Sequence, residues 1–181
     1  TLAQHPHTGT TPSHHGTENM SPEEKMAKGQ EYITKGTTHF SNKDYAKAIA
    51  VYELALGVLQ EYPYVRHDVG STVNVDSNVL EARRDLIRCL SNIATCHLKV
   101  SQGNGSTWKV ILKNCDQAIW VHDGGRVNDD RLLSKILYRR AEVYIQRSET
   151  VKAREDLERA YVCAPDSKSV SVWNVWNDVF N

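Results

Sequence analysis

The segment KGTTHF at residues 35–40, followed by DYAKAI at residues 44–49, decides the fold that we expect for this chain. Gly36 stands at the centre of one amphipathic helical pattern, and a second helical pattern begins after the polar break Asn42-Lys43-Asp44. A small side chain in mid-helix lets a neighbouring helix approach closely, while large side chains fill the grooves beside it. The segment therefore predicts an antiparallel hairpin of two helices.

The same spacing occurs three times along the chain. A small residue at the centre of each odd helix is followed three positions later by a large one, and each even helix has a triplet at offsets of four and seven. One such hairpin cannot bury its apolar face alone, whereas three stacked hairpins can. The small residues and their partners are Gly36/His39, Ala94/His97 and Ala141/Tyr144, and the triplets are Ala48/Tyr52/Ala55, Ile111/Cys115/Ala118 and Ala153/Leu157/Ala160.

The rest of the sequence also predicts helices, so we expect an all-α fold. Ser21-Pro22-Glu23-Glu24 is typical of a helix start, and Asp123-Gly124-Gly125 of a helix end. The second unit has five additional residues, which we assign to the loop Gln102–Ser106. No segment alternates with the period of a half-buried strand. We expect helices over 21–41, 45–61, 78–100, 107–122, 130–147, 150–163 and 167–180.

These elements predict an α-solenoid of three hairpins, at about 21–62, 78–122 and 130–165, closed by a C-terminal capping helix over 167–180. Trp173 and Trp176 in that last helix are expected to pack on the final hairpin, the alternative being an aromatic ligand box. Residues 1–20 contain few large apolar side chains and are expected to form a disordered leader ahead of a domain over 21–181.

Composition excludes several functional classes. Lys+Arg and Asp+Glu are both 22, so no global positive field exists to attract nucleic acid, and no apolar run is long enough to cross a membrane. The leader histidines (His5, His7, His14 and His15) are interpreted as a solubilising tail, with transition-metal binding as the alternative. We expect no metal and no cofactor.

The sequence also indicates no catalytic site. It has no glycine-rich phosphate loop, no HExxH, and no Ser or Cys nucleophile near an obvious base. His39 and His97 occupy packing positions. The four cysteines show no CxxC spacing and are expected to be buried thiols in a reducing compartment. The triplet Asn104-Gly105-Ser106 is treated as part of a loop rather than a glycosylation site.

The repeat segments resemble tetratricopeptide repeats (TPRs). The resemblance rests on 35–40 with 44–49 and on RAEVY at 140–144, and it covers roughly residues 21–180. The segment LSNIATCHLK at 90–99 is similar to the second repeat of the large immunophilins, the FK506-binding proteins with C-terminal TPR domains and the related aryl-hydrocarbon-receptor-interacting type. The chain starts at Thr1, and we expect it to be part of a longer protein.

The resemblance implies a protein-interaction module of co-chaperone type. Members of this group bind the acidic C-terminal tail of heat shock protein 90 or 70 through a carboxylate clamp, and the clamp positions of the second and third repeats fall on Asn92, Lys135 and Arg139. Lys135 and Arg139 are four residues apart on one helix face, and together they offer a carboxylate a point charge and a forked donor. The implied compartment is the cytoplasm, with the nucleus as a second location.

The first repeat departs from this pattern. Ile33 stands where the clamp has a lysine, and Thr37 where it has an asparagine, leaving only a hydroxyl donor. Arg88, one turn before Asn92, is a candidate for compensation. The alternatives are an adaptor whose groove binds an internal, more apolar peptide of another partner, and a solvated face without a ligand. RNA binding by the array is disfavoured by the zero net charge.

Overall fold

The computed structural model describes residues 20–60, 77–101, 105–125 and 127–165, and every element within them is helical. The elements are α1 (Pro22–Ser41), α2 (Tyr45–Gln60), α3 (Ser77–Ser101), the 3-10 turn η1 (Gly105–Thr107), α4 (Trp108–Gly124), α5 (Asp130–Gln146) and α6 (Thr150–Cys163). The six expected helices that fall in these ranges therefore form within two residues of their predicted ends. The predicted leader (apart from residue 20), most of the loop after α3 and the capping helix with Trp173 and Trp176 lie outside the described residues.

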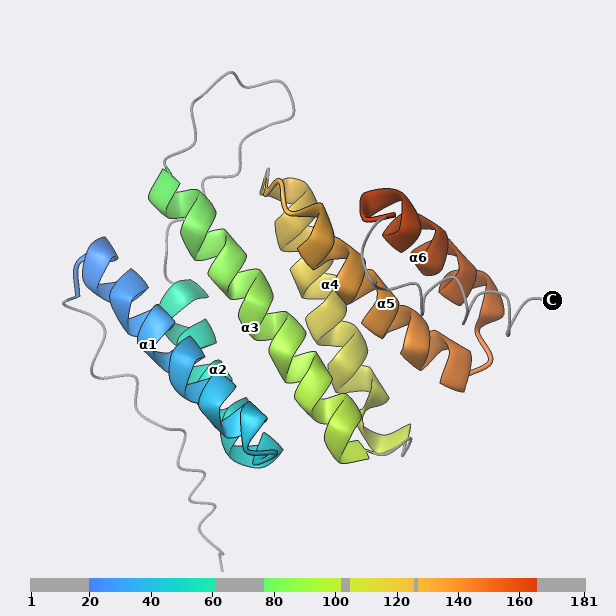
Figure 1. Ribbon diagram of the computed structural model, residues 1–181, viewed down its shortest axis with the longest axis horizontal. Coiled ribbons are helices and arrows are strands. Elements are labelled where there is room, and N and C mark those ends of the chain that lie inside the picture. The colour runs from blue at the N-terminus through green and yellow to red at the C-terminus, as the bar shows by residue number, and fades with distance from the viewer. Residues whose placement is uncertain (1–19, 61–76, 102–104, 126, 166–181) are drawn as a thin grey trace, which may run out of the picture.

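Helices α1, α3 and α5 run side by side across the molecule, with α2 and α4 behind them (Figure 1). Each helix packs against the next, and contacts also join α1 to α3 and α3 to α5. The odd helices thus form a continuous wall. This is the architecture of a stacked-hairpin TPR solenoid, and the predicted fold class is confirmed for the three hairpins.

The repeat positions found from spacing form the core. All nine triplet residues are buried, as are the small residues Gly36, Ala94 and Ala141. A Cβ placed on Gly36 would lie 2.6 Å from the Tyr52 ring, so the glycine is what allows α2 to approach α1 this closely. His39 and His97 are half-buried beside the core rather than within it.

Local signals at the helix ends act as expected. Ser21 Oγ accepts from the Glu24 backbone N–H at 3.2 Å while the Ser21 backbone N–H donates to Glu24 Oε2 at 2.7 Å, a reciprocal capping box. Helix α4 ends at Gly124, within the predicted stop Asp123-Gly124-Gly125 and two residues beyond the expected residue 122. The end is set by Gly125, where a Cβ would lie 2.4 Å from the Val121 carbonyl oxygen.

The first and third hairpins turn in the same way. Lys43 and Ser148, each seven residues after the small residue of its repeat, adopt left-handed backbone angles with φ of 61° and 59°. The second hairpin has the inserted loop at this place instead. No helix in the described ranges combines the length and hydropathy that a bilayer crossing requires.

Candidate functional site

A pocket of about 380 Å³ lies between the helices of the second and third repeats. It brings together four of the five residues that the sequence analysis selected, two from α3 and two from α5, and it leaves out Thr37. Four of its side chains are cationic and one is acidic, in a chain whose formal net charge is zero. The lining residues are Arg88, Ser91, Asn92, Asp129, Arg131, Leu132, Lys135 and Arg139.

Arg139 is the half-buried cation of this pocket. Its Nη1 donates to the Ser91 hydroxyl across the α3–α5 contact, and within the described ranges no carboxylate forms an ion pair with it. Burial lowers the pKa of Arg139 from its usual value of 12.5, although a guanidinium stays charged at neutral pH. The carboxylate of Glu142, three residues on, acts on Arg139 only through its charge and without an ion pair, so a partly desolvated cation still favours the arrival of an anion.

Lys135 precedes Arg139 by one helical turn and is exposed at the pocket. Arg131 precedes Lys135 by another turn, so α5 presents a row of three cations at steps of four residues. The sequence analysis missed Arg131, although the same step of four that linked Lys135 to Arg139 would have found it. In the ranges described, neither Lys135 nor Arg131 forms an ion pair.

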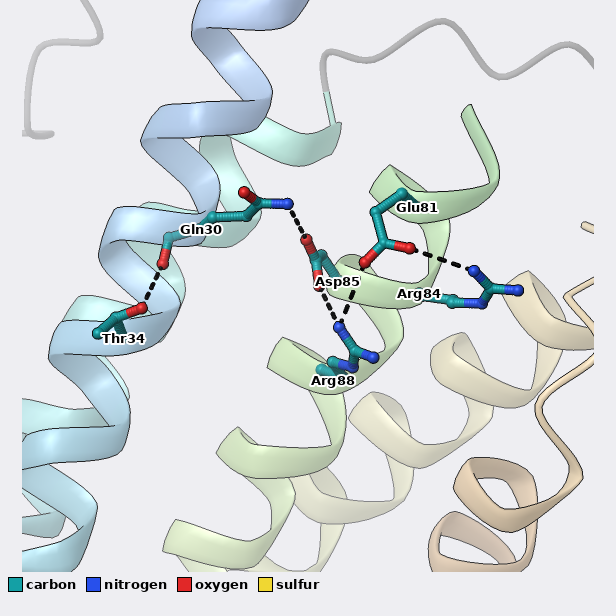
Figure 2. Close-up of polar contacts among 6 residues, drawn as sticks. All are labelled: Gln30, Thr34, Glu81, Arg84, Asp85 and Arg88. Atoms are coloured by element: carbon teal, nitrogen blue, oxygen red, sulfur yellow. Dashed lines mark hydrogen bonds and ion pairs between the residues drawn. The ribbon is translucent and has the colours of Figure 1, made fainter. Parts of the chain in front are cut away.

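Arg88 belongs to a network that joins the first two repeats (Figure 2). Its Nη1 lies 2.8 Å from Asp85 Oδ1 and 3.6 Å from Glu81 Oε1. Asp85 is buried and also accepts a hydrogen bond of 3.2 Å from Gln30 Nε2 on α1. The charge of Arg88 is thus largely compensated within the protein, and its carboxylate partner fixes α1 against α3.

Thr37 contacts Tyr52 and does not line the pocket. Thr37 Oγ1 donates to the Ile33 carbonyl oxygen at 2.8 Å and lies 3.2 Å from the Tyr52 hydroxyl. Because Thr37 has one hydroxyl hydrogen, Tyr52 is the donor in the second contact. Burial raises the pKa of the Tyr52 phenol. Thr37 therefore has no hydrogen left for a ligand unless this arrangement changes.

The first repeat supplies no cation at the position where the resemblance implies a lysine. Ile33 is partly buried and packs against the hydrophobic core. The nearby cations of α1, Lys28 and Lys35, both bind Glu31, at 2.8 Å and 2.5 Å. Positive charge in the odd-helix wall is consequently concentrated between α3 and α5.

Arg140, next to Arg139 in the chain, has a structural role. It donates two hydrogen bonds to the buried Asp156 of α6, at 2.8 Å and 2.6 Å, and a third of 2.7 Å to Asp116 of α4. These contacts tie the third hairpin to the second. The two adjacent arginines therefore have different roles: Arg139 lines the pocket, and Arg140 holds the helices together.

The described residues show little that could perform chemistry. They contain no cluster of three or more His, Cys, Asp and Glu side chains suited to a metal ion. All four cysteines are free, and three are buried. Burial raises the pKa of Cys96 to about 11 and that of Cys115 to about 12, which makes these thiols poor nucleophiles at neutral pH.

No protein-family model matches the chain. The fold is similar to the C-terminal TPR-containing domain of a putative FK506-binding protein of Plasmodium falciparum, with a TM-score of 0.65 and 17% identity over 88% of this chain and 90% of that one. In sequence, the chain is 26% identical over 156 residues to peptidyl-prolyl cis-trans isomerase D of Cryptococcus neoformans. It is 24% identical over 152 residues to FK506-binding protein 59 of Drosophila melanogaster.

These similarities confirm the resemblance to the TPR domains of the large immunophilins. They cover 86% and 84% of this chain but only 39% and 29% of the two relatives, so the chain spans well under half the length of the proteins that it matches. The solved structure establishes the TPR fold, whose stacked hairpins create extended surfaces for binding proteins.

Proposed function

We propose that this domain binds the C-terminal end of a partner protein and holds its terminal carboxylate in the pocket between α3 and α5. The observation that supports this most directly is the convergence of Asn92, Lys135 and Arg139, from two helices, on one cavity. The surplus of cations in the pocket of a neutral chain supports the same conclusion. An anionic ligand gains the most binding free energy from cations that do not already form an ion pair within the protein.

The three side chains suit a carboxylate for different reasons. Lys135 offers a compact, exposed charge, and Arg139 offers a planar guanidinium with parallel N–H groups. Asn92 adds a neutral amide donor from the opposite wall. Because Arg139 is half-buried, its attraction for the carboxylate is less screened by water than that of an exposed cation.

We infer a co-chaperone role in which the ligand is the acidic C-terminal tail of heat shock protein 90 or 70. The similarity to immunophilin TPR domains supports this choice, as does a cation-rich pocket that favours a negatively charged ligand. Such a partner would place the protein in the cytoplasm, and also in the nucleus, where thiols stay reduced. The domain itself is proposed to bind and not to catalyse, so any isomerase activity would belong to another part of a longer protein.

A second candidate is an adaptor that binds an internal peptide of a partner other than a chaperone. It is favoured by the first repeat, where Ile33 packs on the core and the Thr37 hydroxyl is already committed. A ligand of this kind would use the apolar side of the groove and would not need a free carboxylate.

The experiment compares one acidic peptide as the free acid and as the C-terminal amide, titrated into the domain by isothermal calorimetry. The carboxylate mechanism predicts micromolar binding of the free acid, weaker binding of the amide, and further weakening with salt. Lys135→Ala should reduce affinity for the free acid roughly two- to fivefold, since its side chain is exposed. Lys113→Ala, an exposed lysine of α4 outside the pocket, is the matched control.

Equal affinity for the acid and the amide would refute the carboxylate mechanism and favour the adaptor. In that case Arg139→Ala would leave partner binding intact, and the partner recovered would not be the chaperone.

A further inference from the structure

The outer end of the pocket contains a cation that the three-residue clamp does not use. Arg131 lines the pocket in the first turn of α5, is exposed, and forms no ion pair with another described residue. We propose that Arg131 is a specificity residue that binds an acidic side chain of the peptide two positions before its C-terminus. This inference rests on the proposed function, because it assumes that the terminal carboxylate lies at Lys135 and Arg139.

The spacing of the cations determines which peptide position meets Arg131. Steps of four residues along an α-helix advance about 6 Å, so Arg131 lies about 6 Å beyond Lys135 along the axis of α5. Two residues of extended peptide span about 7 Å, and their side chains point to the same side. A peptide lying along α5 with its carboxylate at the inner end and its last side chain facing the helix therefore directs its third-from-last side chain toward Arg131. The penultimate side chain points away and is free to vary.

The other charged groups at the outer end favour Arg131 over Arg88 for this contact. Arg88 is paired with Asp85 at 2.8 Å and with Glu81 at 3.6 Å, and its release would leave the buried Asp85 without its charged partner. Arg131 forms no ion pair of this kind with a described residue. A ligand can bind its charge while the contacts that hold α1 to α3 stay intact.

One acidic side chain shares this part of the pocket and restricts the ligand. Asp129 accepts the Leu132 backbone N–H at 3.0 Å as the N-cap of α5, which holds its carboxylate in place. A single uncompensated arginine beside a fixed carboxylate suits a singly charged carboxylate and disfavours a phosphate dianion. The expected ligand is thus an acidic, unphosphorylated peptide end.

The test uses two free-acid peptides that differ only in Glu or Gln at the third position from the end, with the amidated Glu peptide as a third ligand. Each is titrated into the wild-type domain, Arg131→Gln and the control Lys113→Gln. The wild type and the control should prefer the Glu peptide roughly two- to fivefold, the range of an exposed ion pair. Arg131→Gln should bind both free-acid peptides equally while still preferring free acid to amide.

Moving the Glu to the penultimate position should abolish the difference between wild type and Arg131→Gln. If the wild type discriminates acid from amide but not Glu from Gln, or if Arg131→Gln retains the Glu preference, the role of Arg131 is refuted and the carboxylate pocket stands. Loss of the acid-over-amide preference in the wild type would refute the proposed function itself.

Discussion

The neighbouring arginines of α5 allow binding and stability to be separated by two matched substitutions. Arg139 and Arg140 differ by one position but face different surroundings: the first lines the pocket, and the second binds Asp156 and Asp116. Methionine in place of either keeps much of the aliphatic volume and removes the charge. We predict that Arg139→Met impairs binding with little effect on folding, whereas Arg140→Met has the opposite effect.

The cost at Arg140 follows from the burial of its partner. The Asp156 side chain is 6% exposed and that of Arg140 20%, so Arg140→Met leaves a carboxylate buried without its counter-charge. Breaking a buried pair in this way costs about 3–5 kcal/mol, and we take the lower end because Arg140 is partly solvated. The contact with Asp116, 57% exposed, adds less than about 1 kcal/mol. A loss of about 3 kcal/mol corresponds to a melting temperature lower by about 6–12 °C.

At Arg139, the losses and gains in the free energy of unfolding nearly cancel. Arg139→Met removes a hydrogen bond to Ser91, worth about 1 kcal/mol, and a favourable charge interaction with Glu142, but it also removes the desolvation of a partly buried cation. The free energy of unfolding should therefore change by less than about 1 kcal/mol. Affinity for a free-acid peptide should decrease roughly ten- to a hundredfold, the equivalent of one strong charge-assisted hydrogen bond.

Urea denaturation and peptide calorimetry on the same protein preparations measure both quantities. The assignment of tasks would be wrong if Arg139→Met destabilised the domain as much as Arg140→Met. It would also be wrong if Arg140→Met, at a temperature where it remains folded, lost as much affinity as Arg139→Met.

Two further predictions concern the core. Gly36→Ala should destabilise the domain by about 1–2 kcal/mol, because the new Cβ meets the buried Tyr52 ring at 2.6 Å and this overpacking exceeds the gain in helix propensity. Urea denaturation measures the change, with the exposed Thr38→Ala as control, and equal midpoints for the two variants would contradict the prediction. Burial lowers the pKa of His97 from 6.5, so as pH falls the unfolded chain takes up a proton at this histidine before the folded chain does, and the free energy of unfolding should decrease below about pH 6.5. His97→Gln should reduce the slope of the free energy of unfolding against pH in this range. An identical slope in wild type and variant would exclude His97 as the cause of the pH dependence.

The helices and the repeat could be predicted from the sequence because their signals are local. The capping box at Ser21, the break at Asn42-Lys43-Asp44 and the recurrence of small residues all act over a few positions of chain. Helical periodicity then determines which side chains share a face, and every triplet residue that spacing selected is buried. The end of α4 was predicted only to within two residues, since two adjacent glycines do not reveal which of them approaches a carbonyl.

The partners of the pocket residues could not be predicted in the same way. Helical spacing placed Lys135 and Arg139 on one face, but it did not distinguish an arginine that contacts Ser91, 48 residues away, from its neighbour that binds Asp156. Nor did it show that the Thr37 hydroxyl donates within its own helix, or that Arg88 is held by Asp85.

The sequence alone determined that the chain forms stacked helical hairpins, and it selected most of the pocket residues through their resemblance to a known clamp. Only the tertiary structure decided which cations remain unpaired, that Arg131 joins them and that Thr37 does not. The physical reason is range: helix formation and amphipathic faces depend on neighbours three or four residues away, whereas burial and charge compensation depend on helices far apart in sequence that meet through hairpin packing.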